Sequence, residues 1–281
     1  MKKTLTLITA MLMALSFVIY TNIDADASND RLRVHYIDVG QGDAIFIETE
    51  NETILIDAGT TAGGRTVVNY LNDLGVKVID YVIATHPHSD HIQGFPLVFD
   101  TFEIKNVYAP RVSHTTVAFR NFLQAVEDEG LLIKIATAGV TLPIESIDAV
   151  FVGPTREYAA SALNNWSAVL HITHNKQSFI FTGDVERGAE LDMINQYGAS
   201  LQSDVLKVSH HGANTSTVQE FLNVARPSIA VISVGRNSYG HPTQNVLNRL
   251  EASGAKIYRT DLHGTVVITS DGQRSTVETE K

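Results

Sequence analysis

The chain contains no cysteine, which excludes disulfide bonds, thiolate metal ligands, a cysteine nucleophile and a lipid anchor on a cysteine. It also has no excess of positive charge: 21 Lys and Arg residues stand against 31 Asp and Glu residues, a formal net charge of −10. A surface of that sign repels polyanions as a whole, so any contact with nucleic acid has to be local. Low-complexity tracts are missing as well. With 281 residues, 44% of them hydrophobic, the chain can bury a sizeable core.

The N-terminus has the pattern of an export signal. Lys2 and Lys3 precede an uncharged, mostly apolar run over residues 4–23, and Ala25-Asp26-Ala27 follows as a small-x-small cleavage site. We therefore predict a signal peptide over residues 1–27 and an extracellular, secreted mature protein without a membrane partner. The alternative is an uncleaved membrane anchor, because the run is long enough to span a bilayer.

The body of the chain has no internal linker, since no Pro/Ser-rich stretch, long charge run or solenoid-length repeat interrupts it. We therefore predict a single domain over residues 28–281. Its first β-rich runs, residues 33–38, 44–49 and 53–57, are separated by turn compositions and predict an antiparallel meander. Residues 65–74 are predicted to be helical, and the apolar run of residues 78–85 predicts a buried strand.

Strands and helices alternate through the rest of the chain. Further helices are predicted over residues 117–129, from after residue 184 to about 197, and over 218–224 and 243–252. Further strands are predicted over residues 132–136, 148–151, 168–173, 178–181, 204–208, 228–234, 256–259 and 265–269. Antiparallel strands at both ends with interleaved helices predict an α/β (α+β) fold, in which two mixed sheets pack together and helices cover them.

A histidine-rich loop follows the strand predicted at residues 78–85. Four potential metal ligands, His86, His88, Asp90 and His91, fall within six positions. Imidazole nitrogens and carboxylate oxygens are the ligands that zinc prefers when no thiolate is available, and manganese also accepts them. A tight loop can direct His86 and His88 one way and Asp90 and His91 another, so this segment predicts a site for two adjacent ions.

Three later loops carry further candidates, each at the end of a predicted strand. Asp184 follows residues 178–181 and is the best candidate for a carboxylate that bridges two ions. His210 and His211 follow residues 204–208, and His241 follows residues 228–234. Loops gathered at one edge of a sandwich are a usual place for an active site.

Together these segments resemble the metallo-β-lactamase superfamily, and within it the metallo-β-lactamase-like domain of the ComEC competence family. The resemblance rests on motifs that occur in the family's order: Asp38-Val39-Gly40-Gln41-Gly42-Asp43-Ala44, Leu55-Ile56-Asp57-Ala58-Gly59, the His-x-His-x-Asp-His loop, Thr182-Gly183-Asp184, Val208-Ser209-His210-His211-Gly212 and Tyr239-Gly240-His241-Pro242. It covers residues 33–272 and implies a four-layer αββα metallo-β-lactamase sandwich with two divalent metal ions, Zn or Mn. The membrane channel of a full competence protein is absent from this sequence.

The resemblance also implies roles for the candidate residues. His86 and His88 would bind the first ion, Asp90, His91 and His241 the second, and Asp184 both. Asn165 stands where many members have a third histidine for the first ion, so we expect Asn165 or a water there; His171 is a further candidate. Asp57 would support the His-rich loop by hydrogen bonds, and Asp43 would either line the cleft or form a turn.

We predict a secreted dinuclear-metal hydrolase, most simply a phosphodiesterase or nuclease that uses a metal-bridging hydroxide. The candidate catalytic residues are Asp90, His210 and His211; because the two histidines are adjacent, we expect one of them to point away and His210 to face the site. The substrate would contain a phosphodiester, as in DNA, a nucleotide or a teichoic-acid-like cell-wall polymer. The alternatives are a β-lactam or lactone hydrolase and a catalytically silent metal-binding module. His114 is expected to lie outside the site.

Overall fold

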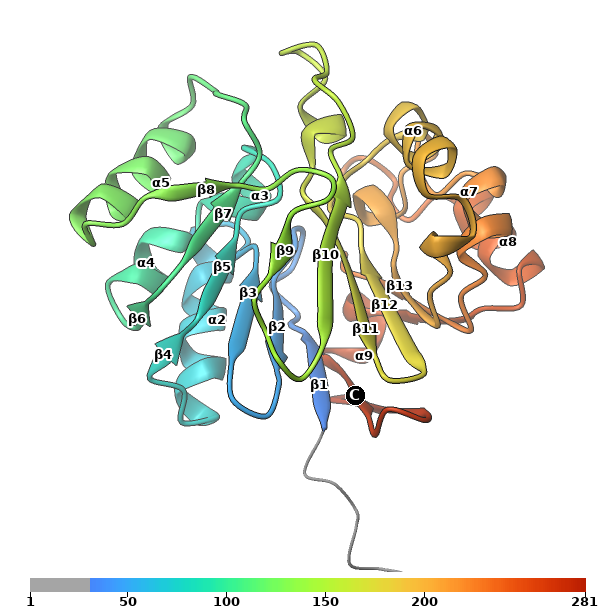
Figure 1. The fold of residues 1–281 in the computed structure, drawn as a ribbon, viewed down its shortest axis with the longest axis horizontal. Coiled ribbons are helices and arrows are strands. Elements are labelled where there is room, and N and C mark those ends of the chain that lie inside the picture. Colours follow the sequence, from blue (N-terminus) through green and yellow to red (C-terminus); the bar gives the residue numbers. More distant parts are fainter. Residues whose placement is uncertain (1–30) are drawn as a thin grey trace, which may run out of the picture. The chain divides into compact units, whose positions relative to one another are not determined.

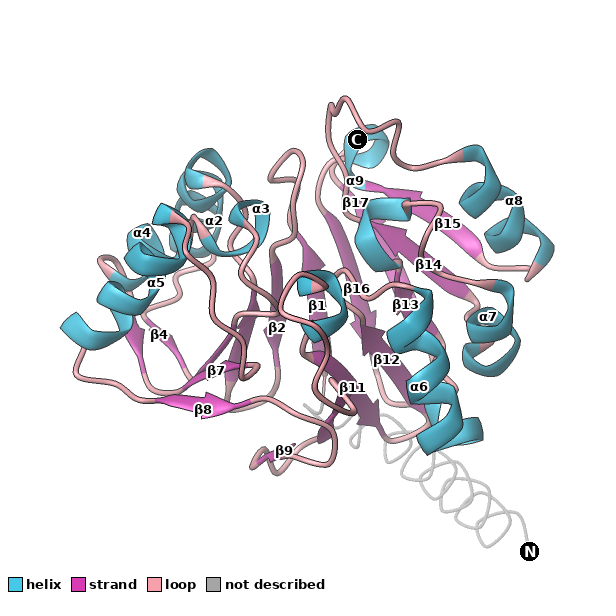
Figure 2. Ribbon diagram, turned by 90° about the horizontal axis from the view of Figure 1, so that it is seen from above, coloured by secondary structure: helices cyan, strands magenta, loops and turns pink. Residues whose placement is uncertain are grey.

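Two mixed β-sheets organise the computed structural model, which describes residues 31–281 (Figures 1 and 2). The predicted signal peptide lies outside the described residues. The larger sheet has the strand order β17 (Ser275–Thr279), β16 (Val266–Ser270), β1 (Leu32–Tyr36), β2 (Ile45–Glu48), β3 (Thr53–Ile56), β5 (Tyr81–Ile83), β7 (Val107–Ala109), β8 (Ile133–Ile135). The β1–β2–β3 meander is antiparallel, as predicted, and β3, β5, β7 and β8 run parallel.

The second sheet has the order β15 (Lys256–Arg259), β14 (Ile229–Ile232), β13 (Val205–Lys207), β12 (Gln177–Phe181), β11 (Val169–His174), β10 (Asp148–Gly153), β9 (Thr141–Leu142). Its strands β12 to β15 are parallel, whereas β9 to β12 are antiparallel. A small two-stranded sheet pairs β4 (Val78–Ile79) with β6 (Glu103–Ile104).

Helices cover the outer faces of both sheets (Figure 2). The larger sheet packs against α2 (Thr61–Asp73), α3 (Ser89–Ile92), α4 (Phe95–Phe99) and α5 (Val117–Asp128), and the second against α6 (Arg187–Tyr197), α7 (Gln219–Ala225) and α8 (Gln244–Ala252). A third cluster of buried side chains fills the space between the sheets, where the Tyr36 and Phe181 rings lie 6.2 Å apart. The predicted four-layer αββα sandwich is therefore confirmed.

The remaining elements are short. The 3-10 helices are η1 (Leu163–Trp166), η2 (Gly198–Leu201) and η3 (Ser209–Gly212), and α9 (Thr260–His263) joins β15 to β16. Within residues 31–281, no helix is long and apolar enough to cross a membrane.

Some boundaries differ from those predicted from the sequence. The run of residues 78–85 is broken at Asp80, whose carboxylate accepts hydrogen bonds from the Thr53 backbone and the Lys105 ammonium, so β4 and β5 join different sheets. The first helix starts four residues earlier than predicted, because the Thr60 hydroxyl accepts the Gly63 N–H and caps it. Gly64 in its first turn allows close contact with the Gly94 backbone.

Candidate metal centre

The site lies where the carboxyl ends of strands from both sheets meet. The His-rich loop after β5 is held by Asp57, which follows β3. One Asp57 oxygen accepts the Thr85 N–H at 2.8 Å, and the other accepts the Thr85 hydroxyl at 2.6 Å and His91 Nδ1 at 2.7 Å. The bond to Nδ1 leaves His91 Nε2 free to face the cleft.

The Gly-Gln-Gly-Asp turn packs directly on this loop. The Asp43 N–H donates to the Asp90 carbonyl at 3.2 Å, and a Cβ at Gly42 would overlap that same carbonyl oxygen. Gly42 also has φ +137°, a conformation that favours glycine. Glycine is therefore required here both for the turn and for the close approach to the loop that carries the ligands.

Nitrogen and carboxylate atoms converge around Asp184. Its Oδ2 lies 3.2 Å from His91 Nε2 and 3.8 Å from His86 Nε2. His88 Nδ1 lies 2.9 Å from His86 Nε2, so the two predicted ligands of the first ion point at the same place. Gly183, with φ +51°, makes the turn that brings Asp184 back over the His-rich loop.

His211 is part of the same cluster. Its Nε2 lies 3.4 Å from Asp90 Oδ2 and 3.5 Å from Asp184 Oδ2, while its Nδ1 donates to the Ser233 carbonyl at 2.9 Å. An imidazole held through one nitrogen, with the other facing carboxylates, is arranged as metal-binding histidines are. The second group of potential ligands is therefore Asp90, His91 and His211.

His210 faces the cleft as well. Its Nε2 is 3.7 Å from Asp184 Oδ2, and its Nδ1 is 3.7 Å from Glu186 Oε1 and 3.4 Å from Asn164 Nδ2. The expectation that one of the two adjacent histidines points away is wrong. Both His210 (φ 49°) and His211 (φ 52°) adopt the left-handed conformation, so their side chains do not alternate as they would on extended chain.

His241 borders the cleft without joining the cluster of ligand atoms within residues 31–281. Its ring lies 5.4 Å from that of His210. Its Nδ1 is buried without a hydrogen-bond partner, so His241 stays a predicted ligand, and His211 is a further candidate that the sequence did not assign to the second ion.

Among the described residues, three other candidates lie outside the groups of ligand atoms. Asn165 turns away from the cleft and accepts the Glu186 N–H at 3.0 Å, because η1 directs it toward the start of α6. His171 is a residue of β11; its Nε2 contacts the Gln202 carbonyl, and it is not among the residues that line the cleft. His114, expected outside the site, lines the cleft with its ring 6.5 Å from that of His88.

Lys207 is the site residue that the sequence analysis missed. The side chain is fully buried, its ammonium contacts the Asp43 carboxylate and donates to the Gly183 carbonyl at 2.8 Å, and it lies 3.8 Å from Asp184 Oδ1. The available signal was its position in β13, a central strand with helices on one side and a sheet on the other, where no side chain can reach the surface. Asp43 is therefore part of the buried charged cluster and is not among the residues that line the cleft.

The side chains fit two divalent cations. Asp43, Asp57, Asp90 and Asp184 bring four carboxylates together with one ammonium, an excess of negative charge that is costly to bury without cations. Within the described part of the chain, His91 Nε2, His211 Nε2 and Asp184 Oδ1 are buried without a hydrogen-bond partner. His91 Nε2 and His211 Nε2 also lie 3.2 Å and 3.5 Å from Asp184 Oδ2. Imidazole nitrogens and carboxylate oxygens without partners are the donor set that zinc and manganese use.

The pKa values show how strongly this cluster attracts positive charge. Burial alone lowers the pKa of His211, yet the carboxylates of Asp184, Asp90 and Asp43 raise it to about 10. Burial also works against the charged form of His91, but Asp184, Asp57 and Asp90 hold its pKa well above the ordinary value. For His86, burial together with the neighbouring His91 lowers the pKa well below that value. The site therefore favours cations beside Asp184.

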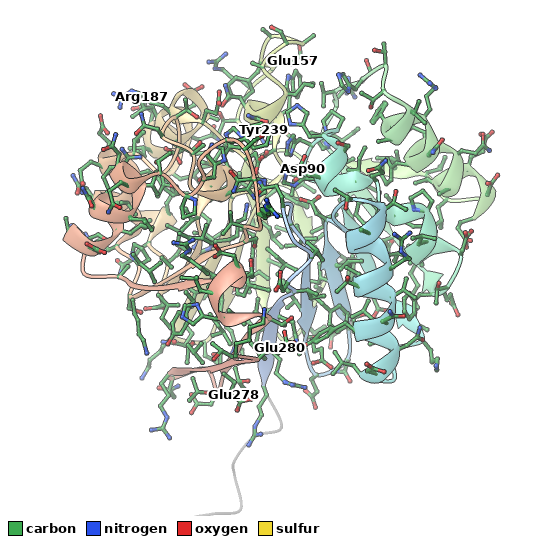
Figure 3. The ribbon with its side chains drawn as sticks, turned by 180° about the vertical axis from the view of Figure 1, so that it is seen from behind. Asp90, Glu157, Arg187, Tyr239, Glu278 and Glu280 are labelled. Carbon is green, nitrogen blue, oxygen red and sulfur yellow. The ribbon has the colours of Figure 1, made fainter. Side chains whose placement is uncertain are left out.

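A cleft of about 350 Å³ opens over the cluster. Its lining includes Gln41, Asp90, Asp184, His210, His211 and Tyr239. Figure 3 shows Asp90 and Tyr239 near one another in the upper middle of the view. His88, Asp90, Asp184 and His241 line the cleft, so these predicted ligands face a space that a small molecule or one unit of a polymer can enter, whereas His86 and His91 are buried.

Residues 37–236 match the model of the metallo-beta-lactamase superfamily, and the chain belongs to this superfamily. Members are generally hydrolases, and the fold usually binds divalent metals. Among curated proteins, the chain is 32% identical over 252 residues to ComE operon protein 3 of Bacillus subtilis, with 83% of this chain and 32% of that protein covered. It is 34% identical over 233 residues to competence protein ComA of Neisseria gonorrhoeae, with 82% and 31% covered. The chain spans about a third of the length of these relatives.

Solved structures share the fold at low sequence identity. The metallo-beta-lactamase fold protein YhfI of Bacillus subtilis has a TM-score of 0.57 at 13% identity, with 86% of this chain and all of that chain covered. Igni18, a metallo hydrolase of Ignicoccus hospitalis, has a TM-score of 0.54 at 17% identity, with 84% and 98% covered. These likenesses support the fold that the strand order establishes.

Proposed function

We propose that this protein is a metal-dependent phosphodiesterase whose substrate binds in the cleft above Asp184. The observation that carries the proposal is the convergence of two groups of ligand atoms on the buried carboxylate of Asp184. One group is His86 and His91, with His88 Nδ1 2.9 Å from His86 Nε2, and the other is Asp90, His91 and His211. Sites that hold two ions around a shared carboxylate are well suited to displacement at phosphorus, because both the attacking and the leaving oxygen need charge stabilisation.

When bound, two divalent ions supply a nucleophilic water of lowered pKa and neutralise charge that develops on the substrate. The chain's own residues do the rest. Asp57 fixes the tautomer and orientation of His91, and the Ser233 carbonyl does the same for His211. His210 is partly exposed, and its Nε2 faces the cleft, where it can donate a hydrogen bond to a phosphoryl or leaving-group oxygen.

The substrate is proposed to be a small diester or one end of a polymer, such as a nucleotide, DNA or a teichoic-acid-like chain. The net charge of −10 disfavours contact with long stretches of polyanion, whereas a single diester meets only the cleft. Secretion is proposed from the N-terminal pattern, and N-terminal sequencing of the mature protein tests it.

The test is hydrolysis of bis-p-nitrophenyl phosphate after chelation and separate readdition of zinc or manganese, with linear and circular DNA in parallel. We expect one metal to restore activity in the wild type and neither to restore it in Asp184→Asn. Bound metal without diester turnover would refute the proposal and favour a β-lactam or lactone substrate, which nitrocefin would detect. No bound metal would likewise refute the proposal and would favour a protein that keeps the fold without catalysis.

A further inference from the structure

Tyr239 exposes an aromatic ring at the mouth of the cleft. Its relative exposure is 72%, and among the exposed large hydrophobic residues of the described chain it is the one aromatic side chain. It lies in the loop between β14 and α8 and lines the same cleft as Asp90 and Asp184 (Figure 3). A ring so exposed adds little to the stability of the core. Its position at the mouth of a cleft therefore indicates that it contacts a ligand.

The loop holds this ring in a defined place. The Asn237 side chain accepts the backbone N–H groups of Tyr239 and His241, both at 3.1 Å. Its amide group donates to the carbonyls of Gly235 at 2.9 Å and His241 at 2.8 Å. One side chain thus fixes both ends of the short turn that carries Tyr239, and a preorganised group loses little entropy when a ligand binds.

Three rings lead from solvent to the metal centre. Tyr239 lies 5.6 Å from His241 with 30° between the ring planes, His241 lies 5.4 Å from His210, and His210 Nε2 lies 3.7 Å from Asp184 Oδ2. A phosphate beside His210 and His211 would therefore place its next substituent toward Tyr239. Because His241 supports one side of the tyrosine ring, the exposed side remains for a ligand.

We propose that Tyr239 is a stacking platform for a nucleobase attached to the scissile phosphodiester, which makes the preferred substrate a nucleic acid end or a nucleotide. This inference rests on the proposed phosphodiesterase function. One aromatic face is enough to stack a base. A quaternary ammonium group such as choline is held by cages of several aromatic rings, and Tyr239 is the one Phe, Tyr or Trp among the cleft-lining residues of the described chain.

The test compares two single-stranded oligomers of equal length and charge: oligothymidylate, and the same backbone with no base on its sugars. The metal-loaded full chain should cleave oligothymidylate with the higher kcat/KM. Tyr239→Ala should lower kcat/KM for oligothymidylate by about 5-fold to 100-fold, as expected for loss of one stacked base, and should leave the base-free oligomer unchanged. Tyr239→Phe keeps the ring and should retain the wild-type preference.

The proposal is overturned if Tyr239→Ala affects both oligomers equally or neither, or if Tyr239→Phe behaves like Tyr239→Ala. Metal content and melting temperature of both variants serve as controls for folding. If the proposed phosphodiesterase function is wrong, the wild type will not hydrolyse bis-p-nitrophenyl phosphate, which distinguishes that failure from failure of the stacking proposal. In that case calorimetric binding of thymidine monophosphate against inorganic phosphate still decides the platform, since Tyr239→Ala should weaken only the nucleotide.

Discussion

The buried ion pair between Lys207 and Asp43 makes a sharp prediction about stability. Replacing Lys207 with Met keeps the length of the side chain and removes its ammonium, so Asp43 is left as a buried carboxylate beside Asp57, Asp90 and Asp184. Removing one partner of a buried pair costs about 3–5 kcal/mol. That is a large share of the roughly 5–15 kcal/mol that holds a typical domain folded.

Urea unfolding in the presence of a chelator measures this cost without metal binding. Lys207→Met and Asp43→Asn should each be destabilised, and the double variant should be less destabilised than the sum of the two, because no buried charge is left unpaired. Lys105→Met is the matched control: Lys105 pairs with Asp80 at the surface, so its loss should leave the unfolding midpoint near that of the wild type. Additive single effects in the cycle, or a Lys207→Met midpoint equal to the wild-type value, would refute the reasoning.

Three further predictions follow from the site and its surroundings. Asp184→Asn and His88→Ala should each abolish turnover and lower the metal stoichiometry measured by mass spectrometry, whereas His171→Ala, in β11 and outside the cleft lining, should do neither; full metal content in Asp184→Asn would contradict the shared-carboxylate assignment. Gly42→Ala should lower metal affinity by displacing the Asp90 carbonyl, while Gly40→Ala, with positive φ but open space, should bind metal as the wild type does; equal losses in both would show that backbone strain, not the close approach, is responsible. Burial raises the pKa of Glu190 from 4.5 to about 7, so the native state keeps a proton that the unfolded chain has lost, and stability should fall as pH rises across that interval; urea unfolding of Glu190→Gln at several pH values should show a flatter dependence, and an unchanged slope would count against this account.

The architecture was largely predictable because it depends on periodic patterns. Alternating and continuous apolar runs identified the meander and most later strands, and the ends of those runs located the loops that carry histidine. Short or polar strands escaped: β17 (Ser275–Thr279) is largely exposed, and β7 (Val107–Ala109) has too few residues to show a period. Such strands form because neighbouring strands supply hydrogen-bond partners, and these partners cannot be identified from the local sequence.

The types of ligand were predictable, whereas their partners in space were not. Histidines and aspartates at close spacing indicate metal chemistry, but His114 enters the cleft only because the loop after β7 folds toward His88. Lys207 was overlooked because lysine is rarely buried. Lys207 is buried because β13 lies in the middle of a sheet that is covered on both faces, and Asp43, in the turn between β1 and β2, pairs with it there.

The adjacent histidines show why the ligand assignment differed from the structure. Two successive side chains alternate on extended chain, so choosing between His210 and His211 was sound for a strand or an ordinary turn. Here both adopt left-handed conformations, which cost non-glycine residues of order 1–3 kcal/mol each and persist only when the surroundings enforce them. The enforcing contacts are visible: the His210 N–H donates to the Gly183 carbonyl at 3.1 Å, and the Ala213 N–H donates back to His210 at 2.8 Å. Asp57, which orients His91, is likewise left-handed at φ 57°. Left-handed backbone therefore occurs at residues whose side chains face Asp184 or orient a histidine that does.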